Sequence, residues 1–469
     1  MKKTLLAALM FCLAFTSQAQ WLPQNAGFTN AFLGFYDISI PNRNTAWAIC
    51  YDGRFGLNQG PFIIDFTRTV NGGDNWIPGK IGTDQTLQPS NISAVSEEEA
   101  WVAMNKRFAT GGGLYHTIDG GVTWEQSNPG EIFNENSFPN FVYFKDRNHG
   151  IAMGDPNDEY FEVYTTNNKG KKWKRVPQAD LPAPLPNEYG WLAGYAVVGN
   201  TVWFGTLSGR MYKSENFGKD WTVSTVDPQG RGVYEIAFND DGRRGVTHVR
   251  DNFGNVFLYN TTDGGNTWTL VGQPANWKRS RITAVPGTDA LVSTSVIVGA
   301  GQGSAVSYDN GVTWTEIEHA TRKAAVKFLD ASTGWAGGYH LSLTVALPQS
   351  NGGLYKSQIV FQVPANQHGR ENSTDQRVIS QSEKMVMNDQ VKIYPTPARD
   401  VVNIELPDAF ARSAGFISIL TTDGKTVETK KVQGSNFVQL SVSKLTPGTY
   451  ILRISSNAQT INKVITIVR

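Results

Sequence analysis

The sequence is poor in cysteine, in net charge and in long apolar segments. Its 469 residues include two cysteines, Cys12 and Cys50, and its formal net charge is +1. Two cysteines make no disulfide framework, so packing alone must hold the core. The chain has no basic stripe, and nucleic acid is therefore not an expected partner. Beyond the N-terminus no apolar run is long enough to span a membrane as a helix, so we expect no transmembrane segment in the mature chain.

The first residues predict a secretory signal peptide over residues 1–19. Lys2 and Lys3 precede an apolar run, and a small–any–small pattern ends at Ala19, where we expect cleavage. Cleavage removes both lysines and changes the formal net charge from +1 to −1. It also leaves a single cysteine, whose apolar neighbours in the sequence predict a buried thiol.

The chain is rich in glycine, in aromatic residues and in copies of one motif. It has 47 glycines and 11% aromatic residues, a composition typical of short strands joined by tight turns. The motif is Ser/Thr-x-Asp/Asn-x-Gly-x-x-Trp, and successive motif tryptophans are 46 to 49 residues apart, which indicates a modular array. The Asp/Asn and Trp positions of its six copies are Asn71 and Trp76, Asp119 and Trp124, Asn168 and Trp173, Asn216 and Trp221, Asp263 and Trp268, and Asp309 and Trp314.

Each motif position has a structural explanation. An Asp or Asn side chain bonds the backbone two residues on and pins a turn, and glycine supplies the positive φ that such turns need. The Ser or Thr hydroxyl bonds nearby backbone groups. Burial of one tryptophan contributes roughly 4–6 kcal/mol as an upper bound. We therefore interpret the motif residues as structural rather than catalytic or metal-binding.

Each repeat contains four short strand-like segments, the pattern of a β-propeller blade. A seventh unit begins near Ala325 but lacks the motif after its third segment, Gly353–Ser357. The stretch from Trp21 resembles the segment that follows each motif, so we predict that it supplies the missing fourth strand. Closing the ring in this way removes exposed sheet edges. The predicted fold class is all-β, with a seven-bladed β-propeller over residues 20–361 that the N-terminal strand closes.

Four further tryptophans recur on the second strand of a blade. Two readings are open to them, packing between blades or a platform on which a ligand stacks, and we favour packing. These residues are Trp47, Trp101, Trp203 and Trp335.

The six motifs resemble the Asp box of bacterial-neuraminidase-repeat propellers. That group includes sialidases, xyloglucanases, the sortilin luminal domain and propellers similar to photosystem II assembly factors. Its members share an architecture but perform different functions, so the resemblance implies the fold rather than an activity.

The C-terminal part predicts a flexible linker over residues 362–390 and a small β-sandwich over residues 391–469. The linker is polar, whereas strand-like alternation resumes at Val391. The stretches from Tyr394 to Ile404, Asp423-Gly-Lys and Leu445 to Leu452 resemble the C-terminal sorting domain of the type IX (Por) secretion system of Bacteroidetes, although Thr396-Pro397 replaces the usual Asn-Pro. The resemblance implies export through the periplasm, type IX machinery as a partner, and a protein secreted or held at the outer-membrane surface. The domain is then either removed or used for attachment.

The candidate ligand site lies on the face opposite the motif turns, because loops there are free to carry function. Arginines from separate blades, with nearby acids and a Tyr–Glu pair, suit an anionic sugar. The competing readings are scattered solvated charges and, for Asp155, an ordinary turn before Pro156. The candidates are Arg54, Arg107, Asp155, Glu188, Tyr189, Arg250, Asp251 and His340, with His248 and His340 also considered as a lyase base.

No catalytic signature, phosphate-binding loop or Cys/His cluster is present, and the sequence predicts no metal and no cofactor. Two hypotheses follow. The first is a monomeric, non-catalytic propeller that binds a glycan or a protein at the cell surface. The second is a glycoside hydrolase or polysaccharide lyase that acts on an acidic glycan.

Overall fold

The computed structural model describes residues 20–28, 33–52, 62–106, 109–296, 301–338, 353–363, 391–406, 415–421, 426–432, 437–456 and 460–468. These residues form strands and one short 3-10 helix, η1 (Gln178–Asp180). The chain divides into two compact units, Met1–Pro364 and Ala365–Arg469. The predicted signal peptide and linker residues 364–390 lie outside the described residues.

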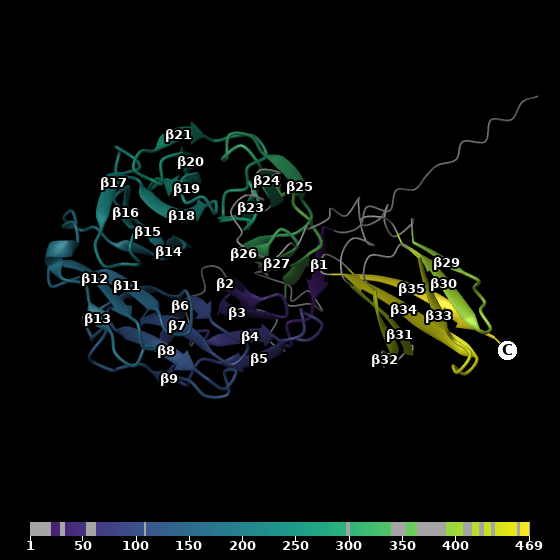
Figure 1. The fold of residues 1–469 in the computed structure, drawn as a ribbon. Coiled ribbons are helices and arrows are strands. Elements are labelled where there is room, and N and C mark those ends of the chain that lie inside the picture. Colours follow the sequence, from purple (N-terminus) through teal and green to yellow (C-terminus); the bar gives the residue numbers. More distant parts are fainter. Residues whose placement is uncertain are drawn as a thin grey trace, which may run out of the picture. The chain divides into compact units, whose positions relative to one another are not determined.

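Seven antiparallel sheets of four strands make up the first unit and are arranged as a ring (Figure 1). The strands of the first three blades are β2 (Leu33–Asn42), β3 (Thr45–Asp52), β4 (Asp65–Thr69) and β5 (Ile77–Lys80); β6 (Leu87–Ala94), β7 (Ala100–Lys106), β8 (Gly112–Thr117) and β9 (Glu125–Gln126); and β10 (Pro139–Phe144), β11 (Gly150–Asn157), β12 (Tyr160–Thr166) and β13 (Lys174–Arg175).

The next three blades repeat the same order. Their strands are β14 (Gly190–Val198), β15 (Thr201–Thr206), β16 (Arg210–Ser214) and β17 (Thr222–Thr225); β18 (Gly232–Phe238), β19 (Gly245–Arg250), β20 (Val256–Thr261) and β21 (Thr269–Gly272); and β22 (Arg281–Ala284), β23 (Leu291–Ser295), β24 (Gly303–Ser307) and β25 (Thr315–Glu318).

The seventh blade joins the two ends of the propeller sequence. Its first three strands are β26 (Lys323–Asp330), β27 (Thr333–Gly338) and β28 (Leu354–Ser357), and its fourth is β1 (Trp21–Gln24). Trp21 pairs with Ser357 and Gln24 with Leu354. The seven-bladed fold closed by the N-terminal strand is therefore confirmed.

The burial of the strands follows from the stacking of the blades. A second strand lies between two neighbouring blades, so both of its faces are covered: six of the seven residues of β7 and all of β27 are buried. The outer strand β5 is largely exposed. This difference explains why the second strands have nearly continuous apolar sequences and the fourth strands do not.

The second-strand tryptophans pack between blades, as the sequence predicted. Trp47 and Trp335 are fully buried, and each contacts the motif tryptophan of the next blade edge to face: Trp47 with Trp124, and Trp335 with Trp76, with ring centroids 6.3 Å apart in both pairs. Trp203 instead donates to the Gly264 carbonyl in the neighbouring motif turn at 3.0 Å. None of the three is available as a platform for a ligand.

The six motif turns share one hydrogen-bond pattern. In the copy around Thr261, the hydroxyl of Thr261 donates to Asp263 at 2.8 Å and accepts from Gly265 N at 3.0 Å, while Asp263 accepts from Thr267 N at 3.0 Å. The Asp or Asn side chain thus accepts from the backbone amide four residues on, not two residues on as expected, because the turn is wider than a single β-turn. The φ of every motif glycine is positive: Gly73, Gly121, Gly170, Gly218, Gly265 and Gly311.

Each motif turn lies beside the turn that joins the first and second strands of its own blade. Backbone bonds connect the two turns in five blades, for example Gly72 N to Asn44 O at 2.8 Å and Phe217 N to Asn200 O at 2.7 Å. Both turns therefore lie on one face of the ring, which we call the motif face. The opposite face, formed by the other two kinds of connection, is called the loop face.

The second unit contains two sheets around one core. One sheet has the order β29 (Lys392–Tyr394), β30 (Val401–Glu405), β33 (Phe437–Ser441), and the other has β32 (Thr426–Val432), β31 (Gly415–Thr421), β34 (Gly448–Ser456), β35 (Thr460–Ile467). Inward-facing residues of both sheets, such as Ile404 and Leu452, share a single buried cluster. The predicted small β-sandwich is therefore confirmed. Residues 423–425, one of the stretches that resemble the sorting domain, lie outside the described residues.

Candidate functional site

Glu188 is held inside the loop face by a dense set of bonds. It lies at the end of the proline-rich connection between β13 and β14 and is 1% exposed. Its carboxylate forms an ion pair with Arg210, accepts from the Thr206 hydroxyl at 2.6 Å, and accepts from Leu185 N at 2.7 Å. Arg210 also donates to the Ala183 carbonyl at 3.0 Å. All these partners belong to the protein, so Glu188 secures the loop and has no free face for a ligand.

Asp155 is more accessible and carries an altered acidity. It follows Gly154 on β11 and accepts from Asn140 Nδ2 at 2.7 Å and from Gly190 N at 2.8 Å. Burial raises the pKa of Asp155 to about 6, and these two hydrogen bonds only partly oppose the shift. Its carboxyl group therefore titrates near neutral pH, as a general acid does.

Arg250 lies over an aromatic ring at the loop-face end of the channel. Its guanidinium is 5.0 Å from the centre of the Tyr234 ring, which contacts Trp191 edge to face at 4.5 Å. His248, two residues earlier on β19, is 1% exposed. Burial lowers the pKa of His248 to about 3, and the charges of Arg250 and Arg281 add to this effect. A histidine this enclosed and this weakly basic does not reach a substrate as a lyase base.

Asp251 shapes the turn that follows β19. It accepts from Phe253 N at 2.9 Å and from Asn255 N at 2.8 Å, the geometry of an Asx turn. Phe253 at the tip of this turn is 90% exposed, and Tyr189 on the neighbouring loop is 45% exposed. Among the remaining candidates, Arg54, Arg107 and His340 lie outside the described residues.

The sequence reasoning missed a group of charged side chains on the innermost strands. Arg281 of β22 forms an ion pair with Glu235 of β18 and donates to the Ala324 carbonyl of β26 at 2.6 Å. Asp37 of β2 and Lys327 of β26 lie on the same lining of the channel, and both act on the pKa of Glu235. The predicted site was placed on loops only, whereas these residues lie on strands. A charged residue in an otherwise apolar strand is a signal of a functional site that the sequence does contain.

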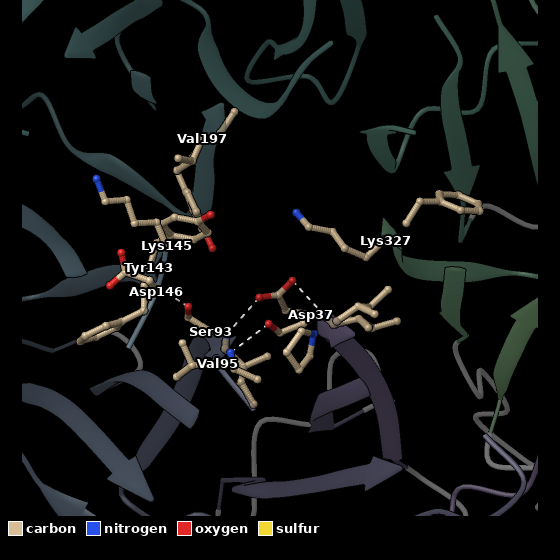
Figure 2. Close-up of a pocket in the computed structure, with 18 of the residues that line it drawn as sticks. Asp37, Ser93, Val95, Tyr143, Lys145, Asp146, Val197 and Lys327 are labelled. Carbon is tan, nitrogen blue, oxygen red and sulfur yellow. Dashed lines mark hydrogen bonds between the residues drawn. The ribbon is translucent and has the colours of Figure 1, made fainter. Parts of the chain in front are cut away.

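A cavity of about 560 Å³ opens beside this group, at the end of the channel toward the motif face (Figure 2). Innermost strands of five blades line it: β2, β6, β10, β14 and β26. The sequence predicted function on the loop face, whereas this cavity lies at the other end of the ring. Its lining includes Asp37, Ser39, Ser93, Tyr143, Lys145, Asp146, Arg147, Tyr195 and Lys327.

Burial governs the acidity of the groups around the cavity. It raises the pKa of Asp37, an effect that the charge of Lys327 opposes first and the amide of Ile92 next. Burial also holds the pKa of Tyr195 well above its usual value, and the negative charge of Asp37 adds to this. The tyrosine is therefore a neutral hydroxyl, able to donate as well as accept.

Over the part of the chain that the structure describes, no three metal-ligating side chains gather into a cluster. In the same part, no helix is long and apolar enough to cross a membrane.

Comparison with known proteins identifies the second unit. Residues 392–468 match the family described as the secretion system C-terminal sorting domain. The protein is thus one that type IX secretion exports to the cell surface or the medium, with a propeller as its first unit. A search of curated proteins finds no match.

Solved structures similar to the chain are propellers with low sequence identity. A structure titled "YCF48 bound to D1 peptide" is 15% identical with a TM-score of 0.48 and covers 73% of this chain and 98% of its own. YCF48 from Cyanidioschyzon merolae is 16% identical with a TM-score of 0.48, and the shares are 72% and 99%. The GH74 enzyme of Niastella koreensis is 12% identical with a TM-score of 0.44, and the shares are 92% and 71%. Likeness at this level says nothing about activity.

Proposed function

We propose that the protein is an exported, non-catalytic binding protein whose loop face recognises a glycan or a protein at the cell surface. The observation that carries the proposal is the engagement of the loop-face acids. Glu188 is enclosed by Arg210 and Thr206, and Asp251 holds its own turn. Acids bonded in this way support the loops, so Glu188 and Asp251 do not form a catalytic pair.

Exposed apolar side chains on the same face support binding. Phe253 is 90% exposed, Leu185 46% and Tyr189 45%, and all three lie on loop-face connections. Large apolar groups at loop tips gain buried area when a partner covers them, and aromatic residues are the commonest anchors of interfaces.

The test measures binding and turnover with the full-length protein. It is applied to a panel of acidic and neutral surface polysaccharides and to outer-membrane fractions. We expect saturable binding without release of reducing ends, and a loss of at least about tenfold in affinity, or 1.4 kcal/mol, for the double variant Phe253→Ser/Tyr189→Ser. The matched control is Val122→Ser, because Val122 is 81% exposed on the motif face. Catalytic release of sugar, or equal losses in both variants, would refute the proposal.

A polysaccharide-active enzyme is the second candidate, and Asp155 favours it. The pKa of Asp155 is raised to about 6 by burial. Glu162, opposite Gly154 on the next strand, is 1% exposed, and its Oε2 has no partner among the described residues. Glu162 is as enclosed as His248, so it acts on Asp155 only through its charge, while Asp155 itself is suited to general-acid catalysis. If this reading holds, Asp155→Asn abolishes sugar release without changing the melting temperature; activity that survives the substitution excludes it.

A further inference from the structure

The cavity at the motif-face end of the channel has features that the propeller does not need for folding. Four blades carry a tryptophan on the second strand, and in each the first-strand residue paired with that tryptophan lines the cavity. In three blades this residue is small, and in the seventh it is Lys327. The residues are Ser39 opposite Trp47, Ser93 opposite Trp101, Ala196 opposite Trp203, and Lys327 opposite Trp335.

Lys327 is a cation of the cavity whose ammonium group forms no ion pair or hydrogen bond with the described residues. It is exposed to the channel, and no described residue pairs with its ammonium group. The other cations of the lining are engaged: Lys145 donates to Asn200 at 2.8 Å, and Arg147 donates to Glu99 at 2.9 Å. Figure 2 shows the ammonium of Lys327 directed into the cavity, across from Asp37. A charged group in this position is available to a ligand of opposite sign.

Asp37 offers acceptors on the other side of the cavity. One carboxylate oxygen accepts from Ile38 N at 2.9 Å and the other from Ile92 N at 3.0 Å. Each oxygen keeps a second lone pair, so the group is fixed in place and still able to accept from a ligand hydroxyl.

Two serines of the lining can donate, whereas the second carboxylate, Asp146, already accepts from Asn148 N at 2.7 Å and His149 N at 2.9 Å. Ser39 accepts from Ala94 N and Ser93 from Phe144 N, both at 2.9 Å, so the backbone uses an oxygen lone pair of each and leaves the hydroxyl proton free. The rings of Tyr143 and Tyr195 form a wall beside them, with centroids 6.1 Å apart. The lining thus combines one free cation, one acceptor group, hydroxyl donors and aromatic surface.

This combination selects among ligand classes. An apolar ligand would leave the charged and hydroxyl groups without partners, which is costly. A phosphate or other polyanion would face the Asp37 carboxylate and would find a single free cation, without a cluster of arginines or backbone amides. A ring with several hydroxyls and one carboxylate satisfies every group. The volume of about 560 Å³ lies within the usual range of small-molecule sites.

We propose that this cavity binds a hexuronic acid residue, with its carboxylate at Lys327, its hydroxyls at Asp37 and the serines, and its ring beside Tyr143. The site lies at the opposite end of the channel from the loop face, so it goes beyond the proposed function and does not depend on it.

The experiment titrates the full-length protein with galacturonate and glucuronate, and with galactose, glucose and acetate as comparisons, by calorimetry and by saturation-transfer NMR. We expect binding of a uronate and a loss of at least about tenfold in affinity for Lys327→Ser, which introduces the residue found at the equivalent position of two other blades. Asp37→Asn weakens binding of the uronate without creating binding of acetate.

Controls separate this site from general effects. Lys172→Ser removes an exposed lysine from a motif turn and leaves the affinity unchanged within twofold. The melting temperature of Lys327→Ser is compared with that of the parent, so that lost binding is not confused with lost folding. Binding of galactose or acetate as tight as that of the uronates, uronate binding unaffected by Lys327→Ser, or no uronate binding at all overturns the proposal. None of these outcomes changes the result expected for Phe253 and Tyr189 on the loop face.

Discussion

Arg210 and Glu188 form a buried ion pair that fastens the proline-rich loop of the fourth blade to strand β16. Arg210 Nε donates to Glu188 Oε1 at 2.9 Å, and both side chains are largely shielded from water. The Thr206 hydroxyl and Leu185 N complete the shell around the carboxylate. A charge in such a place is stable only while its partners remain.

Removal of one member of this pair is expected to destabilise the propeller strongly. Glu188→Ala leaves the Arg210 guanidinium buried without its counter-ion, which costs about 3–5 kcal/mol in the free energy of unfolding. The measurement is urea denaturation followed by tryptophan fluorescence. Arg43→Ala is the control, because Arg43 pairs with Asp330 but its side chain is 67% exposed, and it should change stability by less than about 1 kcal/mol. Similar losses in the two variants would contradict the prediction.

The motif glycines are needed for two reasons, a positive φ and close contact with the neighbouring blade. Alanine substitutions can separate these two contributions. At Gly170 the φ is +68°, and a Cβ would lie 2.2 Å from the Trp101 ring of the preceding blade. Gly199 lies outside the motif, in the turn between β14 and β15; its φ is +59°, and nothing lies within 4 Å of the Cβ position. We expect Gly199→Ala to cost about 1–2 kcal/mol from backbone strain alone, and Gly170→Ala to cost distinctly more. Equal changes in melting temperature would show that contact with the neighbouring blade is unimportant.

Three motif turns carry an aspartate and should weaken in acid. Hydrogen bonds from Thr123 lower the pKa of Asp119 to about 2; at Asp263 burial acts in the opposite direction, but bonds led by the one from Thr267 still bring the pKa to about 2. These values lie below the usual pKa of about 4, so the stabilisation is complete above pH 4 and is lost as the pH falls from about 4 toward 2.

The triple variant Asp119→Asn/Asp263→Asn/Asp309→Asn should therefore lose less stability between pH 4 and pH 2 than the parent does. It should also be less stable at pH 7, because an amide nitrogen cannot accept the hydroxyl bonds that Thr123, Thr267 and Thr313 donate at 2.6 Å. Melting temperatures across this pH range provide the test. Asn71→Ala serves as the control that weakens a turn and keeps the acid dependence; a parent-like slope in the triple variant would refute the assignment.

Closure of the ring depends on Trp21. Its ring is 4% exposed, its Nε1 donates to Ser304 Oγ at 3.0 Å, and it contacts Phe328 with centroids 6.1 Å apart. Trp21→Ala should cost about 3–5 kcal/mol. Leu22→Ala, on the same strand but at a position that is 47% exposed, should stay within about 0.5 kcal/mol. Calorimetric unfolding of both variants decides; a mild effect of Trp21→Ala would mean that β1 is dispensable.

Export depends on the C-terminal unit. Deletion of residues 391–469 in a Bacteroidetes host should retain the protein in the periplasm, because these residues include the part that matches the sorting domain. The retained protein should still fold, since the propeller forms a compact unit of its own. Fractionation followed by limited proteolysis measures both properties. Normal secretion of the shortened chain would refute the role of the domain.

The propeller could be predicted because its sequence repeats one motif at a regular spacing. The motif spacing sets the blade length, and the missing motif after Ser357 together with Trp21 predicts the closure that β1 makes with β28. The reach of the motif acceptor was less well predicted, since Asp263 bonds Thr267 N four residues on rather than the backbone two residues on. Local propensity indicates a turn, but it does not tell which backbone amide the Asp or Asn oxygen accepts from.

The site was harder to predict because it is assembled from strands that are far apart in sequence. Glu188 and Asp251 looked like functional loop acids, and only the structure shows that Arg210 and the turn amides engage them. Asp37 and Lys327 come from the first and last blades and become neighbours only when the ring closes. No local sequence pattern predicts that these two residues are neighbours, although a charged residue within a buried strand indicates a possible site.

The pairing of β1 with β28 also determines when the ring can close during synthesis of the chain. The first strand of the propeller finds its partner only after nearly all of the propeller sequence has been synthesised, since Gln24 pairs with Leu354. Until then the nascent ring has two open edges, and the sorting domain that follows β28 has not yet been made. A chain that stops before β28 therefore lacks both the closed ring and the domain that directs export.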